Sequence, residues 1–365
     1  MSAKHILFVE DKAPERHSFD QALKAWNAAS PDRMFVASVA GTVAEALEKL
    51  SRHRFDCALF DLKLPSGEGG PGDGNDLVKA GLDDFGIPVG IISGNPQDVE
   101  ADLKRVTMLK TFSKDEDDAY EDALKWLGAQ WQMMDILAES RAEVRRSGAA
   151  MFPNRIWPNW QNYEALGLEE RGGLSRIVAR QYAAQIAEHL GIDGGSGGWH
   201  PFEYYISPAM LEDRPQTGDL FRFDGELWVL LTPACDLATG KAPVGLFSHC
   251  RITPPNDQDP LFKWGDSVVA LSDGTLGKEK RKIRDDYFRS LVNQSFSGKH
   301  FLPPLQGSLP MFVEFKHLKT LPIADLDLKT REASIAPAFL SNLVQRFGAY
   351  MSRTGQPNID IRHFG

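Results

Sequence analysis

The sequence has few cysteines, no long apolar run and no tract of low complexity. Three cysteines among 365 residues are too few for a disulfide scaffold, which favours a reducing compartment such as the cytosol. No apolar run is long enough to span a bilayer, and the N-terminus lacks the pattern of a signal peptide. These absences predict a soluble, cytoplasmic protein with no membrane partner.

The charge balance is acidic, with 41 basic and 50 acidic side chains and a formal net charge of -9. Nucleic-acid phosphates are bound by basic surfaces, so nucleic acid is possible as a partner but not favoured. One basic run does occur late in the chain, but acidic residues interrupt it, which favours a solvated helix face. The run consists of Lys278, Lys280, Arg281, Lys282, Arg284 and Arg289.

A chain of this length exceeds one typical hydrophobic core, so two or three domains are expected. The pattern predicts an α/β domain over residues 4–127 and a linker helix with a hinge over 128–165. An α+β domain is predicted over 166–353, with a small β-barrel as its centre, and a tail over 354–365.

Four short apolar runs in the first third of the chain each end in polar residues. Each run reads as a buried strand, and helical segments separate them, which predicts βαβ units and a parallel sheet. Because open α/β sheets place their chemistry at the carboxyl ends of the strands, these residues are expected at one edge. The pairs are 5–9 before Glu10 and Asp11, 57–60 before Asp61, 88–92 before Ser93, and 108–113 before Lys114.

Two helices and one loop are predicted between these runs with particular clarity. Residues 14–29 have an amphipathic pattern, and residues 43–51 follow Thr42, a residue type that caps helix N-termini. Five glycines within residues 66–75 predict a flexible loop directly after Asp61. This loop is either a tolerated insertion, which we favour, or a lid over the aspartate.

This arrangement of residues resembles the receiver domain of two-component response regulators. The resemblance covers roughly the first third of the chain and implies a flavodoxin-like sheet with strand order 2-1-3-4-5. It also implies that Asp61 accepts a phosphoryl group from a histidine kinase or a phosphotransfer protein. Lys114 would pair with Asp61 and then with the phosphoryl group, to which Ser93 would donate a hydrogen bond.

The resemblance further implies that Mg2+ binds beside Asp61. Its protein ligands would be Asp11, Asp61 and the backbone carbonyl of Lys63, with Glu10 acting through water. Oxygen-only ligation with several waters is typical of Mg2+. The ion would also relieve the repulsion among three crowded carboxylates.

The sequence departs from the receiver pattern at two positions. Asp115 follows Lys114 where the family usually has proline. Phe112 lies two residues before Lys114, whereas the switch aromatic of the family lies three before, where Thr111 stands here. The phosphoryl chemistry does not depend on either residue, but the second departure puts the usual coupling through a swinging aromatic ring in question.

Residues 115–146 contain no proline and only one glycine, which predicts one long helix. Apolar residues follow one another at spacings of three and four along it, as in the seam of a coiled coil. This helix either packs on its own domain or pairs with a second chain in a homodimer. The residues that would form the dimer contact are Leu124, Leu127, Trp131 and Met134.

The second half of the chain has a mixed pattern and no recognisable output signature of the winged-helix, cyclic-dinucleotide synthase or phosphodiesterase type. A short run of alternating residues ends in Asp224 and Gly225, a dipeptide typical of tight hairpin turns. The predicted helices cover 174–190, 278–289 and 336–351, and the predicted strands cover 219–223, 227–232, 244–250 and 311–318.

Four residues at the ends of consecutive strands in this half could form a site. They are Cys235, Asp236, His249 and Cys250. Thiolates with an imidazole suit Zn2+, and a cysteine with histidine as its base suits nucleophilic catalysis. The chain has no CxxC spacing, however, and cysteine is often simply buried, which is the interpretation we favour.

The leading hypothesis is therefore a cytoplasmic response regulator, phosphorylated at Asp61 with Mg2+, whose C-terminal domain is a binding or interaction module rather than an enzyme. One alternative is a receiver that controls a nuclease or a cysteine-dependent hydrolase centred on Cys235, His249 and Asp236. Another is a degenerate receiver that acts as a docking or decoy module.

Overall fold

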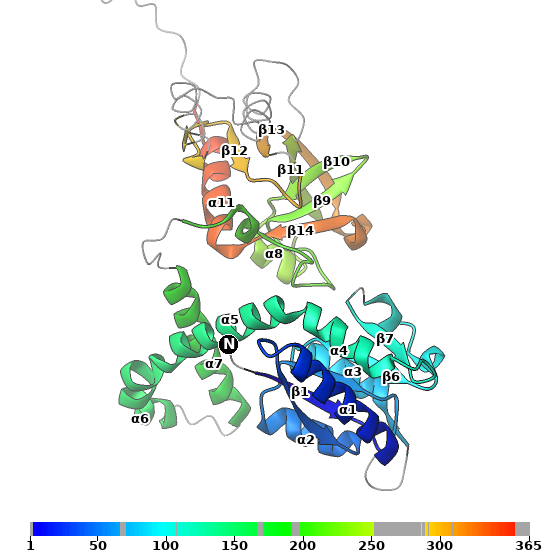
Figure 1. The fold of residues 1–365 in the computed structure, drawn as a ribbon. Coiled ribbons are helices and arrows are strands. Elements are labelled where there is room, and N and C mark those ends of the chain that lie inside the picture. Colours follow the sequence, from blue (N-terminus) through cyan, green and yellow to red (C-terminus); the bar gives the residue numbers. More distant parts are fainter. Residues whose placement is uncertain are drawn as a thin grey trace, which may run out of the picture. The chain divides into compact units, whose positions relative to one another are not determined.

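A computed structural model (Figure 1) divides the chain into two compact units, Met1–Ile192 and Asp193–Gly365. Among the described helices, none combines the length and the apolar character needed to cross a bilayer. The structure describes residues 3–65, 71–106, 108–165, 171–191, 198–251, 286, 289–290, 292–308 and 310–354.

A five-stranded sheet lies at the centre of the first unit. Its strand order is β2-β1-β3-β6-β7, and all four pairings are parallel. The predicted 2-1-3-4-5 order of the receiver fold is therefore confirmed. The strands are β1 (Lys4–Val9), β2 (Phe35–Ala40), β3 (Cys57–Phe60), β6 (Val89–Ser93) and β7 (Lys110–Ser113).

Helices cover both faces of this sheet, so its central strands are buried on both sides and read as continuous apolar runs. One core cluster joins the sheet to α1 and α4, and the other joins it to α2 and α3. Thr42 caps α2 as predicted, because its hydroxyl accepts a hydrogen bond from the amide of Glu45 at 3.1 Å. The helices are α1 (Ala13–Ala29), α2 (Val43–Arg52), α3 (Gly74–Asp83) and α4 (Ala119–Ala129).

The crossover from β6 to β7 departs from the expected helical segment. Its described residues form only two 3-10 turns, η1 (Pro96–Asp98) and η2 (Leu103–Arg105). Only Val99 and Leu103 are buried apolar residues in this stretch. They are spaced by one helical turn, too few to hold an amphipathic α-helix on the sheet.

The glycine-rich segment after Asp61 is more ordered at its ends than the predicted loop over 66–75. Strands β4 (Lys63–Pro65) and β5 (Pro71–Asp73) pair with each other antiparallel, and α3 already begins at Gly74. Residues 66–70 lie outside the described part of the chain. The predicted loop is thus shorter, because its flanks form backbone hydrogen bonds that glycine content alone does not reveal.

The single long helix predicted over 115–146 is wrong, because two helices occupy this region. Helix α4 ends at Ala129, and α5 (Trp131–Ala149) begins after Gln130, whose φ of -86° and ψ of 6° leave the helical region. Gly128 lies against the ring of Trp26, where a Cβ atom would come within 2.4 Å. The ring of Trp26 on α1 fills the space that a side chain would take there, and glycine weakens the helix just before the break.

The proposed homodimer seam belongs instead to the core of the first unit. All four of its side chains pack in the same cluster as β1 and α1, and none is more than 4% exposed. The apolar residues are spaced by three and four because α4 and α5 each turn an apolar face toward the sheet of their own unit. The residues concerned, which are not available to a second chain, are Leu124, Leu127, Trp131 and Met134.

The remaining helices of the first unit follow α5. Helix α7 packs beside α5, and the residues around Gly148 form part of this contact, because a Cβ atom there would lie 3.5 Å from the ring of Tyr182. The elements are the π-helical turn η3 (Phe152–Ile156), the 3-10 turn η4 (Trp157–Asn159), α6 (Trp160–Glu164) and α7 (Arg171–Gly191).

A seven-stranded sheet lies at the centre of the second unit, in the order β12-β13-β11-β10-β9-β14-β8. All its described pairings are antiparallel, and none joins β12 to β8, so the described strands form an open sheet rather than the expected small barrel. The strands are β8 (Tyr205–Ile206), β9 (Asp219–Phe223), β10 (Glu226–Leu230), β11 (Val244–Arg251), β12 (Lys299–Leu302), β13 (Met311–Pro322) and β14 (Arg331–Ile335).

The predicted hairpin is confirmed between β9 and β10. Asp224 and Gly225 have φ angles of 52° and 82°, as a type I′ turn requires. The sheet packs on α11 (Pro337–Met351) through one core cluster, while a second cluster contains Phe221, Leu230 and Phe247.

Short helical segments complete the second unit. They are η5 (Pro201–Tyr204), α8 (Ala234–Ala238), η6 (Ile323–Asp325) and η7 (Leu328–Thr330). The charged helix predicted over 278–289 and its basic run lie outside the described residues except at their ends, as does the predicted tail after residue 354.

Candidate functional site

The carboxyl ends of the parallel strands bring four predicted site residues to one edge of the sheet. Glu10 and Asp61 directly follow β1 and β3, Ser93 ends β6, and Lys114 directly follows β7. Backbone hydrogen bonds extend the ladder to this edge, because the amide of Asp61 donates to the carbonyl of Val9 at 3.0 Å and that of Lys114 to Ser93 at 3.1 Å. The positions of these groups are therefore set by rigid elements.

Lys114 connects two carboxylates at this edge. Its Nζ lies 2.9 Å from Oδ2 of Asp61 and also contacts Oε2 of Glu10. The three side chains are largely buried, at 9%, 5% and 0% exposed for Lys114, Asp61 and Glu10. Because solvent does not screen such a cluster strongly, its charges interact more strongly than surface pairs do.

Burial and charge act in opposite directions on these groups. Burial raises the pKa of Glu10 above its ordinary value, and the hydrogen bond from Lys114 offsets only part of this effect. Burial alone would lower the pKa of Lys114, but its hydrogen bonds to Glu10 and Asp61 and their charges outweigh it, so the pKa of Lys114 is raised. Lys114 is therefore a permanent cation at neutral pH.

Three carboxylates form a group that could hold a divalent ion. Glu10, Asp11 and Asp61 each offer an oxygen, and these oxygens lie within 4.8 Å of one another. Asp11 is exposed, and within the part of the chain described here its carboxylate makes no hydrogen bond or ion pair. An all-oxygen donor set with one uncommitted carboxylate fits Mg2+.

Lys63 and Ser93 also lie at this edge. Lys63 begins β4, and its Nζ is 3.2 Å from Oδ2 of Asp98. The buried hydroxyl of Ser93 accepts a hydrogen bond from the amide of Asn95 at 3.2 Å. Ser93 is therefore tied to the start of the crossover that leads to β7.

The aromatic residue of β7 is packed in the core. Phe112 is 4% exposed, and its ring lies 6.1 Å from that of Trp126, measured between centroids. Thr111, the residue at the position of the family's switch aromatic, is half-buried. No aromatic ring of β7 is thus placed to alternate between inside and outside.

Two side chains at the site were not anticipated from the sequence. Arg16 on α1 donates from Nε to the carbonyl of Glu10 at 2.6 Å and from a terminal nitrogen to that of Asp11 at 3.3 Å. Tyr120 on α4 donates to Glu15 at 2.7 Å, and burial raises its pKa. The only sequence signal for Arg16 was a basic side chain in the first turn of the helix after the acidic pair.

Gly74 allows the chain to pass close to Asp61. A Cβ atom at residue 74 would come within 2.4 Å of Cα of Leu62 and 2.6 Å of the carbonyl oxygen of Asp61. Both are backbone atoms that cannot move aside without displacing the aspartate, so only glycine fits here. One of the five glycines after Asp61 therefore has a packing role beside the site.

The structure does not bring the four predicted residues of the second half together. Cys235 and Asp236 lie on α8, where Sγ of the exposed Cys235 is 3.7 Å from Oδ1 of its neighbour. Cys250 is buried in the core, and burial raises its pKa. His249 and Cys250 are consecutive in β11, so their side chains point to opposite faces of the sheet.

His249 lies instead beside two residues that the sequence did not single out. Its ring shares a face of the sheet with Glu314 and His317 of β13, and ligand atoms of the three side chains lie within 4.8 Å of one another. Neither cysteine belongs to such a group of metal-ligating side chains within the described residues. The predicted cysteine-based zinc or nucleophile site is therefore not formed here.

No protein-family model and no curated protein matches the sequence. Among solved structures, the chain is similar to a response regulator receiver domain protein (CheY-like) from Methanospirillum hungatei JF-1, with 22% identity, a TM-score of 0.29, and coverage of 37% of this chain and 98% of that one. For the chemotaxis response regulator CheY4 of Vibrio cholerae, these values are 19%, 0.28, 34% and 98%.

A third similar structure is the receiver domain of sensor histidine kinase PA1611 from Pseudomonas aeruginosa PAO1, described with a magnesium ion coordinated in its active site cleft. Its identity is 18% and its TM-score 0.27, over 36% of this chain and 98% of that one. These likenesses concern the fold alone.

Proposed function

We propose that this chain is a response regulator in which Asp61 accepts a phosphoryl group from a histidine kinase or a phosphotransfer protein, and in which residues 193–365 carry the output. The observation that carries the proposal is the contact of Lys114 with both Asp61 and Glu10 at the sheet edge. A buried ion pair is rarely more stable than apolar side chains of similar volume. Stability alone therefore gives little reason for this cluster.

The residues at the edge suit transfer of a phosphoryl group to a carboxylate. An oxygen of Asp61 would attack phosphorus, the P–N bond of a phosphohistidine donor would break, and the imidazole would keep the electron pair and take up a proton. Lys114 already contacts Oδ2 of Asp61 and would hold the added negative charge. Asp11, Asp61 and the carbonyl of Lys63 would hold Mg2+, with Glu10 acting through water, and the ion when bound neutralises charge on the phosphoryl oxygens.

The signal would leave the site through Ser93 and the crossover after it. The hydroxyl of Ser93 accepts a hydrogen bond from the amide of Asn95 and can donate at the same time. A movement of Ser93 to donate to a phosphoryl oxygen would therefore pull Asn95 and the loop that follows it. The described part of the crossover contains two short 3-10 turns rather than a continuous helix, so its movement would not have to break an α-helix. This route does not need a swinging aromatic ring at Thr111.

A second candidate is a docking module that is not phosphorylated. The observation in its favour is that Asp61 is buried, with its side chain only 5% exposed, and that its Oδ1 accepts from the amide of Leu62 and its Oδ2 from Lys114. In this case the first unit would present a fixed surface, and the chemistry at the edge would be inactive.

Beryllofluoride, a mimic of the phosphoryl group, separates the two candidates. We expect beryllofluoride with Mg2+ to change hydrogen exchange in residues 94–106 of the wild-type chain. Asp61→Ala should show no such change, and phosphorylation by a small-molecule phosphodonor should add mass only to the wild type. An equal response in both proteins, or none in the wild type, would contradict phosphorylation and favour docking.

A further inference from the structure

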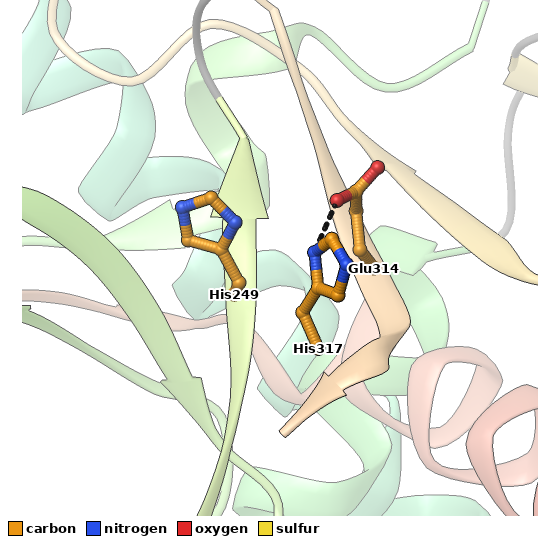
Figure 2. A group of neighbouring side chains, drawn as sticks. All are labelled: His249, Glu314 and His317. Carbon is orange, nitrogen blue, oxygen red and sulfur yellow. Dashed lines mark ion pairs between the residues drawn. The ribbon is translucent and has the colours of Figure 1, made fainter. Parts of the chain in front are cut away.

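The pairing of β11 with β13 is interrupted next to His249. Ser248 pairs with Leu318, but the following residue, His249, pairs with Glu314, so three residues of β13 have no partner on β11. In a regular strand, residues 314 and 317 would face opposite sides of the sheet. The bulge instead brings Nδ1 of His317 to 2.9 Å from Oε2 of Glu314, on the side of His249 (Figure 2).

Glu314 is a buried carboxylate whose two oxygens differ, because one has cationic partners and the other accepts no hydrogen bond. Oε1 lies 2.7 Å from Arg251 and 3.4 Å from Nζ of Lys299, and the side chain is only 7% exposed. Oε2 accepts no hydrogen bond from the residues described, because His317, although close, does not have hydrogen-bond geometry. A buried oxygen that accepts no hydrogen bond lowers the stability of the folded chain, so binding of a further partner at Oε2 would be favourable.

The two imidazoles beside Oε2 are of the kind that binds metals. The ring of His249 packs against Trp228 with 5.0 Å between centroids, which restricts its orientation. Burial lowers the pKa of His249, which keeps the ring neutral and its nitrogen lone pair available. His317 is 62% exposed and reaches the group from the solvent side.

We propose that His249, Glu314 and His317 bind a late first-row divalent cation, of which Zn2+ is the best match. Two imidazoles and one carboxylate are a known donor set for zinc sites that keep an open coordination position. The donor atoms lie within 4.8 Å of one another here, so only a small movement of the side chains would bring all three into contact with one ion. Mg2+ does not compete, since it prefers oxygen ligands alone.

The surroundings define what would fill the open position. Glu314 and His317 line a hollow of about 690 Å³ together with basic side chains, among them Lys299, Lys316 and Arg353. These cations weaken metal binding relative to a neutral pocket, but they favour an anionic group as the remaining ligand. A phosphate or a carboxylate would satisfy both the ion and the basic wall.

The test is a metal titration of the full-length chain in excess Mg2+, which would occupy the proposed oxygen site around Asp61. We expect Zn2+ to bind with one ion per chain, and Co2+ to give the visible absorption of a nitrogen-ligated, low-coordinate ion. His317→Ala should weaken Zn2+ at least about tenfold, as should His249→Ala, since each removes one ligand. His317 is exposed, so its replacement should leave the fold intact.

His53→Ala is the matched control, because His53 is exposed at the end of α2 and should not affect binding. Far-UV circular dichroism of each variant verifies the fold. Absence of Zn2+ binding in excess Mg2+, or equal affinity of the wild type, His249→Ala and His317→Ala, would overturn the proposal. Added phosphate should tighten Zn2+ binding in the wild type if an anion completes the site.

Discussion

The ammonium group of Lys114 lies 2.9 Å from Oδ2 of Asp61, although 53 residues separate the two in sequence. They meet because each follows a strand of the same parallel sheet, and such strands end at one edge. Lys114 also contacts Glu10, which lies a further strand away. The contact between Lys114 and Asp61 therefore depends on the parallel sheet, and it is also part of the candidate site.

Replacing Lys114 with alanine should destabilise the first unit. Two buried carboxylates, Glu10 and Asp61, would lose their shared cation, and breaking such a pair costs on the order of 3 kcal/mol. Urea unfolding in EDTA measures this, and Mg2+ should restore part of the loss. Lys125→Ala, which removes an exposed pair with Asp122, should have a much smaller effect.

Glu10 should make stability depend on pH. Burial raises its pKa above the ordinary value of 4.5, so the folded state binds the proton more tightly than the unfolded state. Ionisation of Glu10 therefore opposes folding. The stability that protonated Glu10 contributes is present below pH 4.5 and is lost as the pH rises through the pKa of the folded state. In EDTA, Glu10→Gln should be more stable relative to wild type at pH 7 than at pH 4, by thermal melts.

Added Mg2+ should act in the opposite direction at pH 7, because the wild type keeps a carboxylate near the ion that Glu10→Gln lacks. A constant difference between the two proteins from pH 4 to pH 7 would contradict the role assigned to burial of Glu10.

Gly74→Ala should disturb the site from outside it. The added Cβ would meet Cα of Leu62 at 2.4 Å and the carbonyl oxygen of Asp61 at 2.6 Å. We expect a loss of stability of about 1–3 kcal/mol and weaker phosphorylation of Asp61. Gly94→Ala is the control, since a Cβ at Gly94 meets nothing within 4 Å. Equal effects of the two substitutions would refute this reasoning.

Trp131 should behave as a core residue and not as an interface residue. Its ring is 4% exposed and packs 5.3 Å from that of Phe35. Trp131→Ala should cost about 3–5 kcal/mol, independent of protein concentration, and leave the mass in solution unchanged. Ile136→Ala, at a position 53% exposed on the same helix, should change stability by less than about 0.5 kcal/mol. Light scattering and denaturant unfolding at two concentrations give the answer.

Burial of His300 should make the second unit less stable at acid pH. It is 1% exposed, bonded to the hydroxyl of Tyr204 at 2.9 Å, and burial lowers its pKa to about 3. The unfolded chain therefore takes up the proton first, and the stability of the second unit falls as the pH drops from 6.5 towards 3. His300→Leu should remove this slope, whereas Tyr204→Phe should retain it. The same slope in all three proteins would be evidence against a buried neutral imidazole.

Much of the first unit was predictable from local pattern. Apolar runs ending in Glu10, Asp61, Ser93 and Lys114 specify buried parallel strands and place their terminal residues on one edge. Glycine at 74 could be seen, but its role could not, because the approach of residue 74 to the backbone of Asp61 is a contact between two different elements.

The strand ends and their polar residues were determined by the sequence itself, because periodicity and turn chemistry are local properties. Only the tertiary structure decided which partner each apolar face packs against, and Trp131 packs against its own sheet rather than a second chain. The same is true of His249, which adjoins Glu314 and His317 and not Cys250. Strand register and a bulge brought those three residues together, and both depend on contacts between segments more than sixty residues apart.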